Sequence, residues 1–324
     1  MQSCPILRAL TAACLAAVLA TAVHAEGFPS RPITLVVPYP PGGGNDVIAR
    51  IVAAKMSAAI GQPIVVENRG GAGGTIATRQ VARTAADGYT LLVATSSLAI
   101  NPSVYANVGY DPRADFSPIG LMAAAQNVLL LHPSVPAASV GELIGRARAA
   151  PGKLTFASTG GGNSVQLAAE LFAAMADVKL TQVPYKGNAP ALSDLLGGHV
   201  DMMFAPLPGA IGLVKDSKVR ALAVTGARRS PLFPDLPTVA EAGLPGYESV
   251  LRYGIVAPAG VPRPAVEKLN AALRAALGTP DVAERLATDG AEVLASTPEA
   301  YAADIAAEEA KWSPIVRKAG IRAE

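Results

Sequence analysis

A six-residue glycine-rich sequence occurs twice in this chain and limits the folds that it can adopt. The two copies, Gly42-Gly43-Gly44-Asn45-Asp46-Val47 and Gly160-Gly161-Gly162-Asn163-Ser164-Val165, agree at five of six positions. Each copy follows a run that is typical of a β-strand and precedes apolar residues at helical spacing. A strand, a turn and a helix form the repeating unit of α/β folds with parallel sheets. We therefore expect two α/β lobes, with one copy in each.

Strand and helix patterns alternate around both copies. Around the first copy we expect strands at 33–37, 64–67 and 89–93, with helices at 47–60 and 70–81. Around the second copy we expect strands at 128–131, 154–157, 181–184, 202–204 and 221–224, with helices at 164–175 and 189–196. The chain from Pro264 onward has helical spacing, and we expect its helices to pack back on the first lobe.

This order of elements predicts how the chain divides between the lobes. Residues 26–125 and 251–324 are expected to form lobe 1, and residues 126–250 are expected to form lobe 2. Each lobe is expected to hold a mixed, mostly parallel sheet flanked by helices, with a ligand cleft between the lobes. Because 51% of the residues are hydrophobic, the chain can bury such cores, and a disordered chain is excluded.

The first 25 residues have the pattern of a secretory signal peptide. Arg8 precedes an apolar stretch over residues 9–23, and the residues that follow match a cleavage site after Ala25. An uncleaved membrane anchor is one alternative, for which the stretch is short. Lipidation at Cys14 is another, but the residues before it lack the usual large aliphatic side chain. Cleavage would export a chain without cysteine, because Cys4 also lies in this segment.

The polar composition offers little for catalysis or for nucleic acid. Lys and Arg number 27 against 25 Asp and Glu, so the basic excess of a nucleic-acid-binding protein is absent. Cleavage removes every thiol, no histidine pair has metal-ligand spacing, and only His132 and His199 remain. We expect no cofactor, no metal and no catalytic residue. An exported α/β enzyme is the alternative, and it would use Asp46, Lys186 or His199 as acid or base.

The two glycine-rich turns are candidates for an anion site. Such a turn exposes backbone N–H groups at the positive end of a helix, so it can hold a carboxylate or phosphate without a cationic side chain. Two turns that face one cleft would clamp an anion; the alternative is that the glycines only permit tight turns. Val47 and Val165 stand where a dinucleotide fingerprint needs its third glycine, and Asp46 is expected to cap the following helix.

Polar residues also follow several predicted strands, at the end where ligands bind in open α/β sheets. Hydroxyl side chains follow two strands, at 95–97 and 158–159, and could donate to ligand oxygens. Lys186 lies in a third such loop, as either a ligand cation or a solvated side chain. Arg252 lies where the chain is expected to return from lobe 2 to lobe 1.

Several collinear motifs resemble those of one family of receptors. They are Arg31-Pro32-Ile33-Thr34-Leu35-Val36-Val37-Pro38 before the first glycine-rich turn, then the segment 66–74, Asp87-Gly88-Tyr89-Thr90-Leu91-Leu92, Val183-Pro184-Tyr185-Lys186-Gly187, Asp194-Leu195-Leu196-Gly197-Gly198, and the segment 237–243. Together they resemble the Bug-type (TctC-like) receptors, the periplasmic solute-binding components of tripartite tricarboxylate transporters. The resemblance covers nearly all of the chain after residue 25.

The resemblance implies a periplasmic binding protein with a type II-like fold, whose two lobes close on a small carboxylated solute. It implies permease subunits of the transporter as partners, with a sensor kinase as the alternative, and we expect a monomer. Carried over position by position, it implies ligand contacts at Tyr39, Pro41, Gly42, Gly43, Gly44, Asn45, Asp46, Thr95, Ser96 and Ser97 of lobe 1, and at Ser158, Thr159, Gly160, Gly161, Gly162, Asn163, Ser164, Tyr185, Lys186, Gly187, Asn188, Asp201 and Ala205 of lobe 2.

Two departures from the family pattern bear on the ligand. Many relatives carry an Asp-Asn pair after the strand that here reads Met203-Phe204-Ala205-Pro206, so an acceptor for a ligand amine is missing. Relatives often have an aromatic residue where Arg252 stands. We therefore expect a non-amino carboxylate, with Arg252 as a bidentate anchor for a second carboxyl group. The alternative is that Arg252 lies on the hinge surface, away from the ligand.

Overall fold

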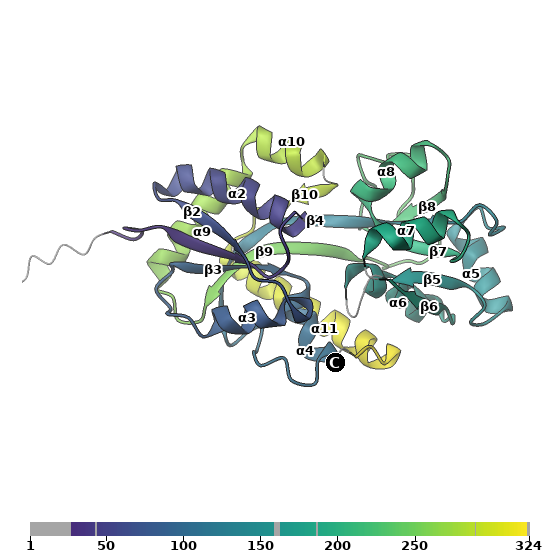
Figure 1. Ribbon diagram of the computed structural model, residues 1–324, viewed down its shortest axis with the longest axis horizontal. Helices are drawn as coiled ribbons and strands as arrows, with labels where there is room; N and C mark the ends of the chain where they lie inside the picture. The colour runs from purple at the N-terminus through teal and green to yellow at the C-terminus, as the bar shows by residue number, and fades with distance from the viewer. Residues whose placement is uncertain (1–26, 43, 159–162, 186, 289, 323–324) are drawn as a thin grey trace, which may run out of the picture.

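Two α/β lobes lie side by side along the long axis of the computed structural model, which describes residues 27–322 except 43, 159–162, 186 and 289 (Figure 1). One path of hydrogen-bonded strands runs through both lobes in the order β2-β1-β3-β9-β4-β7-β5-β6, and β8 and β10 also pair with β4. None of the helices in these residues is long and apolar enough to cross a membrane.

Lobe 1 contains three parallel strands and two antiparallel ones beside a long shared strand. β1 (Ile33–Val37) lies between β2 (Ile64–Asn68) and β3 (Thr90–Thr95), all parallel. β9 (Val250–Pro258) pairs antiparallel with β3 and with β4 (Phe116–Leu131), and β10 (Ala291–Val293) pairs antiparallel with β4. The three predicted strands of this lobe are therefore confirmed, and the central strand β1 is the most deeply buried of them, with Ile33, Leu35, Val36 and Val37 fully buried.

Helices cover both faces of the lobe 1 sheet. Alternate strand residues such as Leu35 and Leu91 pack on α2 (Gly44–Ile60), α9 (Arg263–Leu277) and α10 (Pro280–Thr288). Residues of opposite parity, such as Val36 and Leu92, pack on α3 (Thr75–Ala82), which follows the short η1 (Ala72–Gly74), and on α4 (Ser97–Val104). Side chains alternate between the faces of a strand, so each face supplies one core.

Lobe 2 repeats this arrangement around the second half of β4. β5 (Thr155–Ser158) lies parallel to β6 (Thr181–Pro184) and to β7 (Met202–Pro206), while β7 and β8 (Arg220–Val224) pair antiparallel with β4. α5 (Val140–Ala149) and α6 (Ser164–Ala176) cover one face, and α7 (Asn188–Leu196) and α8 (Leu207–Lys215) cover the other. The predicted two-lobed α/β fold is confirmed.

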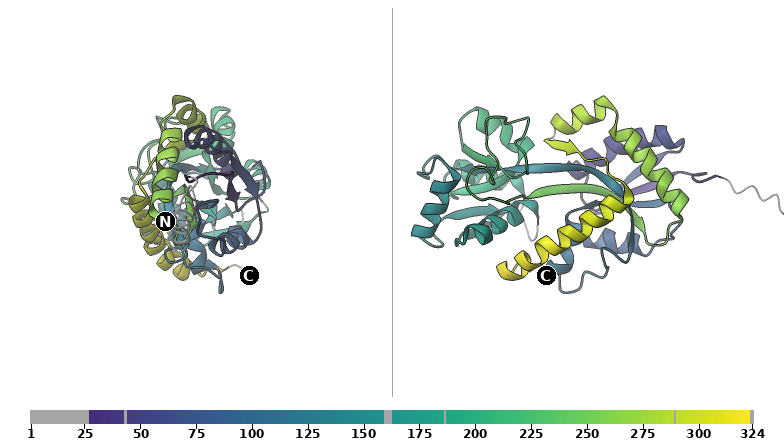
Figure 2. Two further views of the ribbon diagram at one scale, coloured as in Figure 1. Left: turned by 90° about the vertical axis from the view of Figure 1, so that its left-hand side faces the viewer. Right: turned by 180° about the vertical axis from the view of Figure 1, so that it is seen from behind.

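The C-terminal helix α11 (Pro298–Ala319) contradicts part of the expectation for the last helices. α9 and α10 pack on lobe 1 as expected, but α11 runs from lobe 1 to lobe 2 across the back of the molecule (Figure 2). Tyr301 and Ile305 belong to the lobe 1 core, whereas Trp312 and Val316 pack with Phe172 in the core of lobe 2. A helix of 22 residues is about 33 Å long, which is enough to reach both cores.

The predicted lobe boundaries lie within two strands, β4 and β9, which connect the lobes. Residues 125 and 126 are consecutive in β4, and residues 250 and 251 are consecutive in β9. The two strands pair from Phe116↔Pro258 to Gln126↔Val250. We call them the hinge strands. The division into 26–125, 126–250 and 251–324 stays a prediction.

Candidate functional site

A cleft of about 510 Å³ lies between the lobes at the hinge strands. Its lining comes from both lobes, and the described lining residues include no charged side chain. They are Gly44, Asn45, Val47, Ile48, Ala125, Gln126, Asn127, Asn163, Ser164, Val165, Asn188, Leu192, Pro206, Gly209, Leu251 and Tyr253.

Four helices begin at this cleft. Gly44 and Asn45 open α2, Ser164 opens α6, Asn188 opens α7, and α8 begins directly after Pro206. α2 comes from lobe 1 and the other three come from lobe 2, so helix N-termini converge on one space from both sides. Each contributes a partial positive charge and backbone N–H groups without an intrahelical partner. The cleft is therefore electropositive without a cation in its described lining.

Local sequence explains why the lobe 2 helices start where they do. Asn163 caps α6, because its side chain accepts from the Gln166 N–H at 3.0 Å. Gly187 precedes α7 with φ of 124°, a backbone conformation that residues with a Cβ atom rarely adopt. Asn127 of β4 donates from Nδ2 to the Ser164 carbonyl at 3.3 Å and ties the start of α6 to a hinge strand.

Asp46 holds the first glycine-rich turn from behind the cleft. It is buried, and its carboxylate accepts from the Gly42 N–H at 2.9 Å, from Arg50 Nε at 3.0 Å and from Asn68 Nδ2 at 3.0 Å. The Arg50 hydrogen bond, helped by those of Gly42 and Asn68, lowers the Asp46 pKa from 3.8 to about 2 against the opposing effect of burial. Asp46 is therefore a fixed anion that orders the turn, and it does not line the cleft.

The hydroxyl groups of lobe 1 bind one another beside the cleft. Tyr39 Oη lies 3.0 Å from Thr95 Oγ1 and donates to Ser97 Oγ at 3.2 Å. Ser96 bonds to the backbone of Arg252. None of these four side chains, nor Pro41 or Gly42, lines the cleft, so the structure brings only Gly44 and Asn45 of the described lobe 1 candidates into it.

Four lobe 2 candidates are not part of the described lining of the cleft. Ser158 is buried and accepts from Gln182 Nε2 at 2.6 Å. Tyr185 Oη donates to Asp194 at 2.8 Å, and burial together with this carboxylate raises the Tyr185 pKa to about 12. Ala205 is buried opposite Val128. Gly187 precedes α7 but is not itself in the lining.

Asp201 is at the wrong end of its strand for a ligand contact. It precedes β7, whose opposite end, Pro206, reaches the cleft. Its carboxylate instead accepts from the backbone N–H and the hydroxyl of Thr155, at 2.7 and 2.8 Å. A five-residue strand separates the two ends by about 16 Å.

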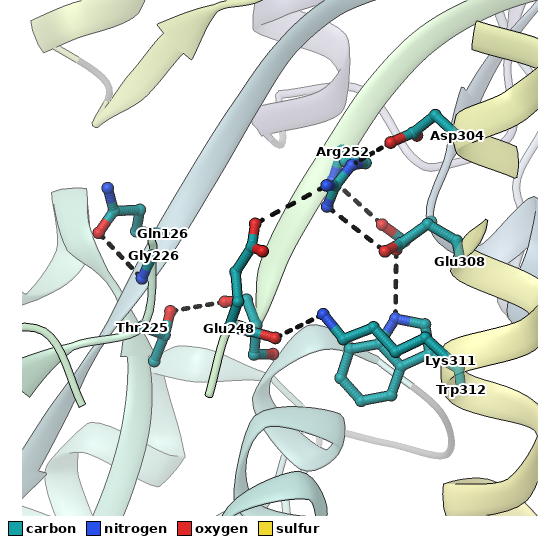
Figure 3. A network of polar contacts seen from close by, with 11 residues as sticks. Gln126, Thr225, Gly226, Glu248, Arg252, Asp304, Glu308, Lys311 and Trp312 are labelled. Carbon is teal, nitrogen blue, oxygen red and sulfur yellow. Dashed lines mark hydrogen bonds and ion pairs between the residues drawn. The ribbon is translucent and has the colours of Figure 1, made fainter. Parts of the chain in front are cut away.

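Arg252 is also placed away from the cleft. Its guanidinium is half-buried and pairs with Asp304, Glu308 and Glu248 (Figure 3). The structure thus does not bring Arg252 to a position where it could anchor a carboxyl group, and it agrees with the alternative placement at the hinge. Gly43, Thr159, Gly160, Gly161, Gly162 and Lys186 lie outside the described residues.

Sequence reasoning missed much of the cleft wall. Gln126 and Asn127 on β4, and Leu251 and Tyr253 on β9, line the cleft although no sequence motif marked them. Their position follows from the pairing of the two hinge strands, which only the tertiary structure shows. Within the described part of the chain, no three His, Cys, Asp or Glu side chains could hold a metal ion together.

Comparison with known proteins decides the family. The model of the tripartite tricarboxylate transporter family receptor (TctC) matches residues 48–321. The chain belongs to this TctC family. It is 37% identical over 306 residues to the protein BugT of Bordetella pertussis, covering 94% of each chain. The resemblance to Bug-type receptors is confirmed, and TctC proteins are periplasmic solute-binding receptors.

Two solved structures show the same fold. A protein of R. palustris, Rpa4515 with adipate, is similar to this chain with a TM-score of 0.79 and 40% identity, over 91% of this chain and 100% of that one. MatC of Rhodopseudomonas palustris with bound malate is similar with a TM-score of 0.74 and 36% identity, over 89% of this chain and 100% of that one. The chain is therefore a solute-binding receptor of the tricarboxylate-transporter type.

Proposed function

We propose that the cleft captures a small carboxylated solute by closure of the two lobes. The observation that carries this proposal is the convergence of four helix N-termini on a cleft whose described lining has no charged side chain. A carboxylate there accepts from backbone N–H groups and balances the helix dipoles. A solute that touches α2 of lobe 1 and α6, α7 or α8 of lobe 2 binds the closed arrangement better than the open one, which drives closure.

The same cleft disfavours an amino acid as the solute. An ammonium group would face the positive ends of four helices, and the described lining offers no carboxylate to offset its charge. The missing Asp-Asn pair of the sequence agrees with this, since Pro206 lines the cleft where that pair would end. We therefore propose that the natural ligand is a carboxylic acid without an amino group.

The lining also favours a solute with an apolar body. Val47, Ile48, Val165, Leu192 and Leu251 contribute aliphatic surface between the helix ends. Hydrocarbon groups of the solute that leave water and pack on this surface increase the affinity in proportion to the apolar area buried, by about 25 cal/mol per Å². Asn45 lines the cleft, and its buried side-chain oxygen has no hydrogen-bond partner within the described chain, so a solute hydroxyl would pair with it once the side chain turns toward the cleft.

The remaining parts of the proposal concern the export of the receptor and the fate of its solute. We propose cleavage after Ala25, capture without chemical change of the solute, and delivery by a monomer to the permease subunits of a tripartite transporter. Two of the residues that an enzyme would need lie elsewhere. Asp46 is held by Arg50 behind the turn, and His199 follows the far end of α7.

The test starts from protein recovered from the periplasm of an expressing bacterium, whose mass shows whether residues 1–25 are removed. After unfolding and refolding to strip any bound solute, adipate, malate, benzoate and glutamate are titrated by calorimetry and thermal shift. A solute at about 100 times its Kd stabilises by about 2.7 kcal/mol, which raises Tm by several degrees in a chain of this size. We expect shifts for one or more of the first three and none for glutamate. If none of the three acids binds in calorimetry or raises Tm, the proposal is contradicted.

A matched pair of variants tests the helix ends directly. Asn188→Asp adds a negative charge to the first turn of α7, where it stabilises the helix but repels a bound carboxylate. We expect the affinity for the best acid to fall more than about tenfold while Tm holds or rises. Asn107→Asp makes the same change at an exposed loop position and is expected to change neither. Equal affinity in both variants would exclude α7 from the site.

A further inference from the structure

Arg252 lies on the hinge strand β9 but faces away from the cleft. Side chains alternate along a strand, and its neighbours Leu251 and Tyr253 both line the cleft. Its backbone is fixed to lobe 1, because its N–H donates to Ser96 Oγ at 3.1 Å and its carbonyl accepts from the Ser96 N–H at 3.2 Å. The guanidinium therefore lies behind the hinge, facing α11 (Figure 3).

Three carboxylates surround this guanidinium. Nε donates to Asp304 Oδ1 at 2.7 Å, Nη1 lies 3.4 Å from Glu308 Oε1, and Nη2 lies 3.7 Å from Glu248 Oε1. The Arg252 side chain is 21% exposed and that of Glu308 is 6% exposed. Burial raises the pKa of Asp304 and of Glu308, so their charged forms depend on Arg252. We call these four residues the hinge cluster.

The hinge cluster joins groups that are fixed to different lobes. Glu248 precedes Ser249, whose backbone is held by Thr225 of lobe 2. The Ser249 N–H donates to the Thr225 carbonyl at 2.8 Å, and the Ser249 carbonyl accepts from Thr225 Oγ1 at 2.6 Å. Lys311 of α11 donates to the Glu248 carbonyl at 2.6 Å. Arg252, four residues after Glu248, is held by lobe 1. The chain thus crosses between the lobes inside the cluster.

Helix α11 reinforces the same connection. Asp304 and Glu308 are four residues apart, so they share one face of α11 toward Arg252. Glu308 also accepts from Trp312 Nε1 at 3.2 Å, and Trp312 is buried in the core of lobe 2. Asp304 adjoins Ile305 of the lobe 1 core, and Glu308 lies between Ile305 and Trp312 of the lobe 2 core, so the carboxylates that bind the hinge strand lie where α11 passes from one lobe to the other.

Closing a cleft in front of a hinge separates groups that lie behind it. A partly buried ion pair is favourable only in good geometry, so separation of these groups would cost the cluster its interactions. The cleft of about 510 Å³ is larger than a short dicarboxylate, so closure of the lobes on such a solute has to narrow the cleft from the arrangement seen here.

We propose that the hinge cluster stabilises this open arrangement and opposes closure, so that it sets solute affinity although none of its four residues lines the cleft. The inference rests on the proposed function only for the role of closure in binding. When closure is required for tight binding, the apparent Kd is the intrinsic Kd divided by the fraction of closed molecules. Weakening the cluster therefore raises that fraction and lowers the apparent Kd.

The experiment measures the distance between the lobes without any solute. Spin labels on Ala59→Cys of lobe 1 and Ala149→Cys of lobe 2, both exposed, report that distance by electron–electron dipolar spectroscopy. Glu308→Gln keeps the shape of the side chain and an oxygen for Trp312. Glu248→Gln changes the most exposed carboxylate of the cluster and leaves both cores intact, so it remains informative if the first variant folds poorly.

Glu309→Gln is the matched control. It removes the same charge from the next residue of α11, whose ion pair with Arg113 at 3.1 Å lies outside the cluster. We expect the short-distance population to rise about fivefold in Glu308→Gln, less in Glu248→Gln, and not in the control. Unchanged distances in both cluster variants, or a shift to longer ones, would overturn the proposal.

A second readout separates this inference from the proposed function. Adipate titrated into the same proteins is expected to bind about fivefold more tightly to Glu308→Gln than to the control. If the distances shorten but adipate and the other acids do not bind any variant, the hinge inference stands and the proposed solute class is wrong. If adipate binds all variants equally and the distances do not change, the cluster has no part in closure.

Discussion

The stability of the first glycine-rich turn should depend on pH through Asp46. Each pKa unit is worth about 1.4 kcal/mol, so a carboxyl with a pKa of about 2 in the folded chain and 3.8 in the unfolded chain stabilises the fold by about 2 kcal/mol near pH 7. The side chain of Asp46 is only 6% exposed, but that of Arg50 is 52% exposed, so solvent screening makes about 2 kcal/mol the upper end of this contribution. The perturbation is Asp46→Asn, which keeps the shape and removes the charge.

The sign of the pH dependence follows from the direction of the pKa shift. A carboxyl with a lowered pKa in the folded chain contributes its full stability above the unfolded pKa, and this contribution falls as the pH drops through 3.8 toward 2. We expect Asp46→Asn to lower the free energy of unfolding by up to about 2 kcal/mol at pH 7 and by less than ~0.5 kcal/mol at pH 2. Urea unfolding at several pH values measures both.

The control is Asp216→Asn, which removes the same charge from an exposed pair with Lys218. Pairs of that kind contribute between 0 and about 1 kcal/mol, so this variant should stay close to the wild type at every pH. Two results would contradict this prediction. A loss of equal size at pH 7 and pH 2 would mean that hydrogen-bond geometry and not charge is responsible, and no loss at pH 7 would mean that the network does not stabilise the turn.

Three further predictions test the packing and the site. Gly254→Ala would place a methyl group 2.6 Å from Tyr301 Cε1, and because that ring is buried we expect a loss of about 1–3 kcal/mol in urea unfolding; adding Tyr301→Leu should recover part of it. Asn163→Ala removes the cap of α6, so it should cost about 1 kcal/mol and also weaken acid binding in calorimetry. Asp201→Asn should cost about 1 kcal/mol through its contacts with Thr155 but leave solute affinity unchanged, because it lies at the far end of β7.

The sequence predicted those elements whose local pattern agrees with their tertiary role. The strand at 33–37 is β-branched and fully embedded in a parallel sheet, and both glycine-rich copies do lie between a strand and a helix. The segment 116–126, by contrast, contains Gly120, Pro118 and several alanines, which are poor strand formers. It forms β4 because β9 pairs along its length, and that pairing joins residues far apart in the chain.

The differences between the expected site and the lining of the cleft have the same origin. Strand direction places Asp201 at the end of β7 far from the cleft, because ligands meet the carboxyl ends of parallel strands and Asp201 precedes β7. Arg252 could not be placed without β9. Once residues 250–258 are a strand, alternation puts Leu251 and Tyr253 on the cleft side and Arg252 on the other.

The cleft and the hinge cluster contribute to solute binding in different ways. Helix ends provide partial charges that are fixed in place, and they hold a carboxylate without the desolvation cost of a buried lysine or arginine. Because the described lining has no full charge, the contact energy with a small acid is modest, and the equilibrium between open and closed lobes becomes a large part of the observed affinity. The full charges of this region lie behind the hinge, where Arg252 and its three carboxylates act on that equilibrium. Affinity can thus change through the back of the hinge strand while Leu251 and Tyr253, on its front, keep the selectivity of the cleft.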